Sequence, residues 1–539
     1  MHRAADAVLV RISEIIVETL RGVYPEFIEG LRVTNNHKMK LSFLIRIYIV
    51  ALIFRLVPVL LTANLGIGLD DMFQYDMLAR SLASGNGFRW YAEDDLKLLA
   101  PYVDFDLSTA TGYDSEYGLY TSFRAPLYPA FLALVYFFAG QEFSRFFFAR
   151  LAQAVLLGAT LAPLTYLVAK QFTFHFPLSK EVESGKWKVE ELSAWIVACY
   201  PMLLVYPLGL GTENLFFVLL LSSFLFLLKS INQPSTFYFL LSGIFLGLTA
   251  LTRSVILPFA LVAIVYVIAR SVFSATKQSD VQSVRLLRYA RNDGVIMLIA
   301  FVLVITPWII RNSLLHGKLT GVETSMGYNL YVGYHPDGNG SFVFGPSLDL
   351  LSIMDDSERD EVGTQKAIEF IKAEPERFIP LVLNRLGFFF GLEKRVLMYF
   401  YSNNLLGYIP QPILLTIAFV LLFPFVLLSI FSVFGILSLK RNHQTSLLLL
   451  LIACYLLPHI FILSEDRFHL ALIPYIAILA SYGVTLISTK QLNFKAWQVA
   501  ISAILICLLL LNWGLELNRD ADKIVSILSP TGNTAGFPY

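Results

Sequence analysis

Long apolar stretches recur along this chain, and most of them match the thickness of a lipid bilayer. A bilayer core is about 30 Å thick, so a crossing helix needs roughly 20 apolar residues. These stretches predict an all-α polytopic membrane protein with about eleven transmembrane helices. The expected spans are residues 41–63, 146–169, 193–210, 214–230, 235–252, 254–272, 293–311, 411–438, 446–463, 468–488 and 497–514.

The composition agrees with a membrane protein. Hydrophobic residues make up 56% of the 539 residues, charged residues only 15%, and the mean hydropathy is +0.64, which is well above the usual values for soluble domains. The net charge of +1 gives no reason to expect nucleic acid as a partner. Cys199, Cys454 and Cys507 lie far apart within apolar stretches, so we interpret them as small core residues and not as metal ligands or disulfide partners.

Basic residues in alternate loops set the expected orientation, because cytoplasmic loops carry an excess of lysine and arginine. With the N-terminus in the cytoplasm, the basic loops all fall on the inner side. Their basic residues are Lys170, Lys180, Lys186, Lys188, Lys229, Lys277, Arg285, Arg288, Arg291, Lys440, Arg441, Lys490 and Lys495. The short apolar stretch 125–140 is expected to be an interfacial or re-entrant helix, because a full crossing there would place these loops outside.

This orientation divides the chain into one membrane domain with two large extracytoplasmic loops. Residues 1–40 are expected to form a cytoplasmic amphipathic segment, and residues 41–515 the membrane domain. The first external loop, 65–145, is acidic and carries the candidate catalytic residues. The second, 312–410, combines a turn-rich part with a charged helix. Residues 516–539 are expected to be an external tail without fixed structure.

Ionisable residues remain at the external ends of the spans. They are Asp70, Asp71, Glu213, Arg253, Arg311 and Arg467. Each arginine alone is equally well explained as a side chain that extends to the membrane interface. As a set, carboxylates and several cations on one membrane face indicate a site that handles an anionic ligand beside a general base.

The adjacent carboxylates of Asp70 and Asp71 form the sharpest feature. Neighbouring carboxylates repel, so one of the two should keep its proton to a higher pH, which suits proton abstraction near neutrality. The alternative is structural: Asp71 as the N-cap of a helix that begins with "MFQYDMLARSLASG". The two roles are compatible, since a capping carboxylate lies where the helix leaves the loop.

Two weaker candidates lie in other loops. Glu213 directly precedes the fourth span and is either an ordinary helix-start residue or a ligand for a metal, a sugar or an acceptor. His335 lies in a loop rich in glycine and asparagine, where contact with a ligand is one interpretation. His459 and His469 flank the "SEDR" turn and are more typical of interface residues than of catalysts.

Several short motifs occur in order along one membrane face. They are the D-x-x-x-Y-x-x-x-A spacing of Asp71, Tyr75 and Ala79, followed by "GNGF" (85–88), "RAPLYPAFLALVY" (124–136), "TE" (212–213), "LTRSVILPF" (251–259), "PWIIRN" (307–312), "GYNLYVGYHPDGNG" (327–340) and "RFHLALIP" (467–474). From about Leu41 to Ser488 the chain thereby resembles the bacterial relatives of protein O-mannosyltransferases and of lipid A aminoarabinose transferase. These are C-type (GT-C) membrane glycosyltransferases of the family 39 type.

The resemblance implies a GT-C fold and an inverting transfer of a sugar from a polyprenyl-phosphate donor to a protein, lipid or glycan acceptor outside a bacterial plasma membrane. It implies Asp71 as general base. The mannosyltransferases usually show Asp-Glu there, and this chain has Asp70-Asp71 followed by Met72, so which aspartate is the base stays open. Phosphate-binding candidates are Arg253, Arg311 and Arg467. Candidates for substrate binding are Glu213, Tyr75, Arg124, His335 and Asn339.

Some questions stay open at the level of sequence. No cofactor is expected with certainty; a divalent metal held by Glu213 and Asp70 has only two carboxylate ligands in its favour. The alternative functions are a transporter or flippase of lipid-linked glycans, and a polymerase or ligase of surface glycans. Transporters tend to show repeated halves and helices interrupted at mid-membrane, and neither pattern is evident in this sequence.

Overall fold

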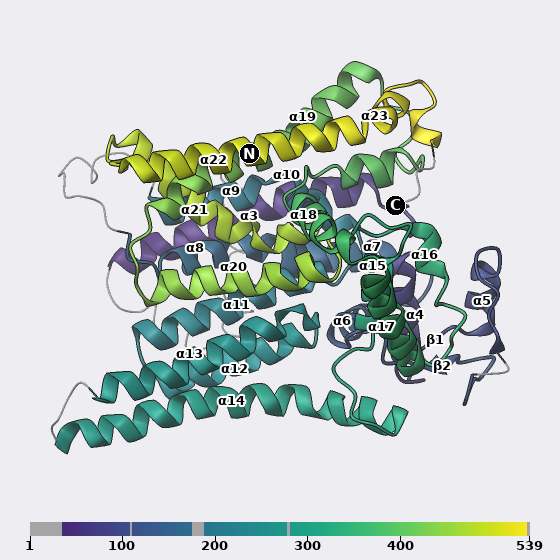
Figure 1. Cartoon of the computed structure of the whole chain (residues 1–539), viewed down its shortest axis with the longest axis horizontal. Helices are drawn as coiled ribbons and strands as arrows, with labels where there is room; N and C mark the ends of the chain where they lie inside the picture. Colours follow the sequence, from purple (N-terminus) through teal and green to yellow (C-terminus); the bar gives the residue numbers. More distant parts are fainter. Residues whose placement is uncertain (1–34, 108–109, 175–187, 277–280, 536–539) are drawn as a thin grey trace, which may run out of the picture.

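The protein is a bundle of long helices, with shorter elements gathered at one end (Figure 1). The computed structural model describes residues 35–107, 110–174, 188–276 and 281–535. The helices of the bundle are α3 (Asn35–Leu61), α7 (Arg145–Ala152), α8 (Leu161–Ala169), α9 (Val189–Cys199), α10 (Pro201–Val205), α11 (Glu213–Asn232), α12 (Thr236–Ala250), α13 (Leu257–Thr276), α14 (Val281–His316), α19 (Gln411–Leu437), α20 (His443–Phe461), α21 (Ile473–Ser488) and α22 (Ala496–Arg519).

All of the expected spans fall on helices of this bundle. Among the described residues, eight helices are long and apolar enough to cross a membrane, or nine if the pair Val189–Cys199 and Pro201–Leu208, bent by 53°, forms one span. The two remaining expected spans form the shorter apolar helices Thr236–Ala250 and Ser254–Arg270. The all-helical polytopic architecture is therefore confirmed, whereas the count of about eleven crossings stays a prediction.

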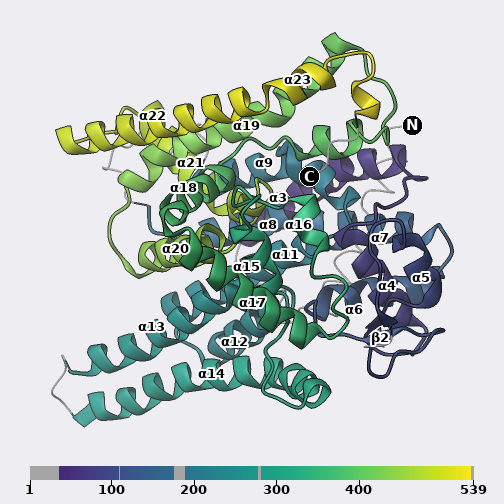
Figure 2. The same ribbon diagram turned by 45° about the vertical axis from the view of Figure 1, so that its right-hand side comes forward.

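The two long loops form the elements at the end of the bundle, and Figure 2 shows the same grouping from a second side. The first loop contains α4 (Asp71–Ala83), β1 (Arg89–Trp90), α5 (Glu93–Leu99), β2 (Leu119–Tyr120) and α6 (Leu127–Ala139); the second contains α15 (Met326–Tyr334), α16 (Phe344–Leu348), α17 (Asp356–Ala373) and α18 (Phe378–Phe389). β1 pairs antiparallel with β2. With 13 residues, α6 has the short length expected of a helix that does not cross.

The two ends of the chain differ in how far they test the sequence predictions. The expected cytoplasmic segment 1–40 lies outside the described residues up to residue 34, and α3 begins at Asn35. At the other end, residues predicted to lack fixed structure are partly helical: α22 runs to Arg519, followed by α23 (Ala521–Ile527) and a 3₁₀ turn at Gly532–Thr534. The side chain of Ile527 is buried and stabilises this arrangement.

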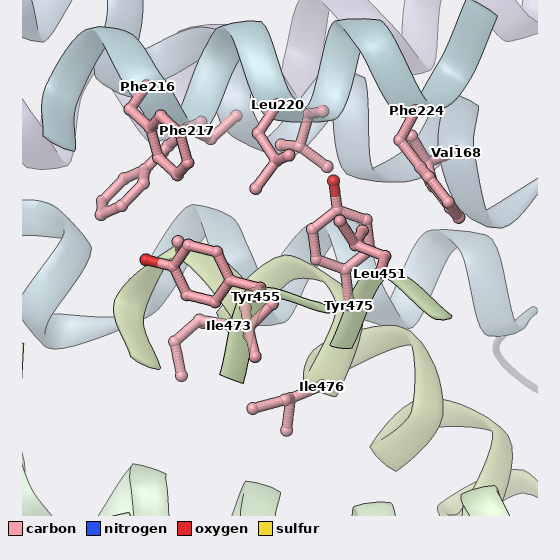
Figure 3. Close-up of a cluster of buried hydrophobic side chains, with 14 of the residues drawn as sticks. Val168, Phe216, Phe217, Leu220, Phe224, Leu451, Tyr455, Ile473, Tyr475 and Ile476 are labelled. Carbon is pink, nitrogen blue, oxygen red and sulfur yellow. The ribbon is translucent and has the colours of Figure 1, made fainter. Parts of the chain in front are cut away.

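Aromatic side chains fill the centre of the bundle. Figure 3 shows Phe216 and Phe224 of α11 beside Tyr455 of α20 and Tyr475 of α21. The ring centroids of Phe216 and Tyr455 are 6.0 Å apart, and those of Phe224 and Tyr475 are 5.4 Å apart. The span that contains α21 is 89% buried, against 11% for α22. α21 is therefore a central helix and α22 a peripheral one, whose exposed apolar face suits lipid.

Buried arginines tie irregular backbone to the bundle. Arg55 of α3 is fully buried and donates to the carbonyl oxygens of Val197 and Ala198, both at 3.2 Å, next to the break between α9 and α10. Carbonyl oxygens at a break in a helix lack a partner within the helix, and where water is absent another donor must bind them. Arg150 donates to the carbonyl oxygen of Leu208 at 2.8 Å and to that of Gly66 at 2.6 Å. It thereby fixes the loop that leads into α4.

Candidate functional site

Asp70 and Asp71 lie where α4 begins. The backbone of Asp70 is extended, and its carboxylate accepts a hydrogen bond from the Met72 N–H at 2.8 Å, so Asp70 is the N-cap. The expected cap was Asp71, one residue further on, and this alternative is wrong. Asp71 is the first helical residue and does not cap the helix. Its carboxylate contacts other elements instead.

Two arginines from distant parts of the chain bind the Asp71 carboxylate. Arg124 Nη2 contacts Oδ1, and Arg467 Nη2 contacts Oδ2 at 3.2 Å. Gln74, one turn along α4, accepts from Arg124 Nε at 2.8 Å and fixes this guanidinium. The Arg124 guanidinium also lies 5.3 Å from the ring centre of Tyr75. Two predicted site residues, Arg124 of the first loop and Arg467, therefore meet at Asp71.

Glu213 and Arg253 form the neighbouring ion pair. Arg253 Nη1 lies 2.6 Å from Glu213 Oε1, and Arg467 Nε lies 3.8 Å from the same oxygen. Arg467 thus lies between the carboxylates of Asp71 and Glu213. Five predicted residues, which are Asp71, Arg124, Glu213, Arg253 and Arg467, form one continuous charged cluster.

Two further charged residues belong to this cluster and were not predicted. Glu465 Oε2 lies 2.7 Å from Arg467 Nε and 2.8 Å from Arg395 Nη1, so one carboxylate bridges two guanidinium groups. The sequence held a signal for both residues. Glu465 stands in the "SEDR" turn, two positions before Arg467, and Arg395 ends a charged triplet between apolar segments.

Part of the cluster lines a cavity, together with apolar and aromatic side chains. The charged residues are Asp70, Asp71, Glu213, Arg395 and Arg467, and the apolar and aromatic ones include Met202, Val205, Tyr206, Val396, Tyr399 and Phe400. The cavity therefore suits a ligand with an anionic group and an apolar part.

The two aspartates titrate in opposite directions. Burial, followed by the adjacent charge of Asp71, raises the pKa of Asp70. Burial also disfavours the charged form of Asp71, but the guanidinium groups of Arg124 and then Arg467 outweigh it and lower the pKa of Asp71. The Asp71 side chain is 38% exposed. The carboxylate of Asp71 is therefore ionised and accessible, while Asp70 keeps its proton to higher pH.

Three other predicted residues make their described contacts elsewhere. Arg311 donates to the carbonyl oxygens of Thr121 and Phe88, and its guanidinium lies 4.8 Å from the Trp308 ring centre. His335 Nε2 is 3.7 Å from an Asp349 carboxylate oxygen, and the Asn339 side chain accepts from the N–H of Ser341. None of the three lines the cavity formed by the described residues.

The described side chains do not include a group of three or more histidine, cysteine, aspartate or glutamate residues placed to hold a metal ion. The suggestion that Asp70 and Glu213 hold a divalent metal rests on these two carboxylates alone, and most sites for such ions need more oxygen ligands.

Comparison with known proteins finds structural neighbours but no match by sequence. No family model and no curated protein matches the sequence. Crystal structures of ArnT from Cupriavidus metallidurans, bound to undecaprenyl phosphate and in the apo state, match with TM-scores of 0.34 and 0.32 and identities of 13% and 14%. Both matches cover 82% of this chain, and 78% and 77% of the ArnT chains. ArnT is a GT-C family 39 aminoarabinose transferase, the group that the sequence motifs resemble. Because the TM-scores are low, we infer function from the contacts of this chain alone.

Proposed function

We propose that this protein is an inverting glycosyltransferase that moves a sugar from a polyprenyl-phosphate donor to an acceptor at the extracytoplasmic face of a membrane. One observation carries the proposal: the ionised, accessible carboxylate of Asp71 shares a cavity with the guanidinium groups of Arg467 and Arg395. A base for the acceptor and cations for a leaving phosphate are the two requirements of this reaction.

Asp71 is the proposed general base. It would take the proton of the acceptor hydroxyl or amine as that group attacks the anomeric carbon from the side opposite the phosphate, so that the configuration inverts. The lowered pKa keeps Asp71 ionised at neutral pH but also lowers its proton affinity, so the raised pKa that the sequence led us to expect of the base belongs to Asp70. Its pairing with Arg124 and Arg467 holds the carboxylate in one orientation.

Arg467, Arg253 and Arg395 are the proposed phosphate ligands. Departure of the lipid phosphate leaves negative charge that bidentate arginines are well suited to stabilise. Their carboxylate partners include Asp71, Glu213 and Glu465. These carboxylates orient the arginines at the cavity.

The apolar part of the cavity lining is the proposed path of the isoprenoid chain. Met202, Val205 and Phe400 belong to this part. A polyprenyl phosphate has the same division into an apolar chain and an anionic head. Burial of each isoprenoid methylene group contributes about 0.8 kcal/mol to binding.

The placement of charge favours an enzyme over a transporter. Asp71 of the cluster is the first residue of α4, and α4 lies at the end of the bundle where the two long loops gather (Figure 1), whereas transporters bind their substrate near the middle of the membrane. Arg55, a charged residue inside a span, is occupied by backbone carbonyl groups. A polymerase or ligase of surface glycans would share the same donor chemistry and differ in its acceptor.

Donor turnover tests this proposal. Purified protein in liposomes is incubated with radiolabelled polyprenyl-phosphate hexoses and pentoses and with a membrane extract as acceptor source. We expect release of free polyprenyl phosphate by the wild-type protein and its loss in folded Asp71→Asn. Movement of intact donor across the liposome membrane without cleavage would establish the transporter, and full turnover by Asp71→Asn would remove the proposed base.

A further inference from the structure

Three consecutive charged residues, Glu393, Lys394 and Arg395, follow α18 and reach three different partners. Glu393 Oε1 lies 2.9 Å from His469 Nε2, and Tyr200 donates its hydroxyl to the same oxygen at 2.5 Å. Lys394 Nζ contacts carboxylates at the end of α22. Arg395 pairs with Glu465 at the cavity. Contacts with three different partners therefore fix the segment, and only the contact of Arg395 lies at the cavity.

The segment 393–395 lies beside the segment 465–469, and two side-chain contacts join them. The Glu393–His469 contact lies on one side of Arg467, and the Arg395–Glu465 ion pair lies on the other. Two of the three arginines proposed to bind phosphate, Arg395 and Arg467, are thus carried by one linked pair of segments. A displacement of either segment would move both guanidinium groups.

The end of α22 holds this pair of segments from outside. Lys394 Nζ lies 2.6 Å from Glu516 Oε1 and also contacts the Asp520 carboxylate. Glu516 Oε2 accepts from the Leu392 N–H at 2.9 Å, and Trp513 donates to the carbonyl oxygen of Phe390 at 2.8 Å. α22 is otherwise peripheral, and its span is 11% buried, so these polar contacts form a local anchor.

Burial makes this anchor strong. The side chains of Lys394, Glu516 and Asp520 are 17%, 6% and 14% exposed. Loss of one partner from a buried ion pair leaves an uncompensated charge, and the surrounding segments shift to solvate it. None of these three charged side chains lines the cavity formed by the described residues. Their substitution would therefore have to affect ligand binding through Arg395.

We propose that Lys394, Glu516 and Asp520 are positioning residues, which hold Arg395 and Arg467 in the geometry that binds the donor phosphate. This inference rests on the proposed function and assigns a role to the last helix of the bundle. Supporting contacts behind a binding group commonly change its affinity about tenfold or more when they are removed.

Binding of a short isoprenyl phosphate tests the inference. Farnesyl phosphate and uncharged farnesol are titrated by calorimetry into the full-length protein in detergent. We expect Lys394→Met to weaken farnesyl phosphate binding about tenfold and to change farnesol binding by less than about twofold. Lys394→Arg, which keeps the charge, should restore the phosphate affinity to within about threefold. Lys318→Met removes a lysine from the exposed ion pair with Glu361 and is the matched control.

The outcomes separate this inference from the proposed function. Equal losses for both ligands in Lys394→Met would indicate a purely structural role and overturn the inference. So would an unchanged phosphate affinity in Lys394→Met when Arg467→Met has lost it. An unchanged affinity in Arg467→Met, or no preference of the wild-type protein for farnesyl phosphate over farnesol, would instead remove the phosphate site itself. If Lys394→Met does not fold, Asp520→Asn applies the same criterion and leaves the Lys394–Glu516 ion pair in place.

Discussion

Helix α4 carries two aspartates, Asp71 and Asp76, that bind the same kinds of partner with different results. Asp76 accepts from Arg145 Nε at 2.8 Å and Nη2 at 2.9 Å, from Arg80 Nε at 2.9 Å and from the Tyr136 hydroxyl at 2.9 Å, and its side chain is 1% exposed. Asp71 binds one arginine at each oxygen and is 38% exposed.

The difference between them is the acceptor capacity that remains. An ionised carboxylate offers about four acceptor positions. At Asp76 they are filled by fixed donors, so this residue is part of the folded framework. At Asp71 two positions stay open toward a cavity. Pairing with arginine therefore does not distinguish structure from chemistry; access and unfilled acceptor positions do.

The largest expected effect is that of Asp71→Asn. The amide cannot take a proton, and the loss of a general base costs about 10²–10⁴-fold in rate. We expect sugar transfer to fall by about 10³-fold, with a melting temperature close to that of the wild-type protein because the side chain is partly exposed. Transfer is measured with radiolabelled donor. A drop in melting temperature as large as that of Asp76→Asn would cancel the contrast between the two aspartates.

Asp76→Asn is expected to act on stability. It removes a buried charge from between Arg80 and Arg145; Arg80 keeps its ion pair with Asp95, whereas Arg145 loses its carboxylate partner. Breaking a buried ion pair in this way costs about 3–5 kcal/mol. We expect a marked loss in the thermal melting temperature in detergent, while the protein that stays folded keeps its transfer rate. A rate loss without a stability loss would place Asp76 in the chemistry.

Arg467→Met should separate charge from packing at the cavity. Methionine keeps an apolar stem of similar reach but cannot donate to a phosphate, and the loss of one transition-state donor costs about 10²–10³-fold. We expect kcat/KM to fall about 10²-fold, mostly through kcat. A rise in KM alone would indicate that Arg467 binds substrate and transition state equally.

The sequence predicted the helices and part of the site for identifiable reasons. Continuous apolar stretches located the bundle, and the adjacent carboxylates pointed to the start of α4. Arg395 and Glu465 were missed because their meeting depends on tertiary contact across 70 residues, which no local spacing encodes. Arg311 was predicted for the site from its place at the end of a span, yet it donates to the backbone carbonyls of Thr121 and Phe88 and does not line the cavity.

Arg311→Met tests whether an arginine at the end of a span but outside the cavity contributes to the phosphate site. The contacts of Arg311 join α14 to Thr121, which follows β2, and to Phe88, which precedes β1, so its removal should loosen the first loop. We expect kcat/KM to fall by less than about threefold and melting to occur a few degrees lower. An effect equal to that of Arg467→Met would return Arg311 to the phosphate site.

The smallest expected effect, that of Asp70→Asn, depends on pH. Because burial and the adjacent charge of Asp71 raise the pKa of Asp70 in the folded state, the protonated form favours folding. This contribution is complete below the ordinary aspartate pKa of about 3.9 and is lost as the pH rises through the raised value. Asparagine is neutral throughout and keeps the oxygen that accepts from Met72. Melting curves at several pH values should therefore show a gain for Asp70→Asn that grows from acid to neutral pH. If transfer by this variant falls as far as in Asp71→Asn, Asp70 is the base, and Asp70 takes the place of Asp71 in the comparison with Asp76.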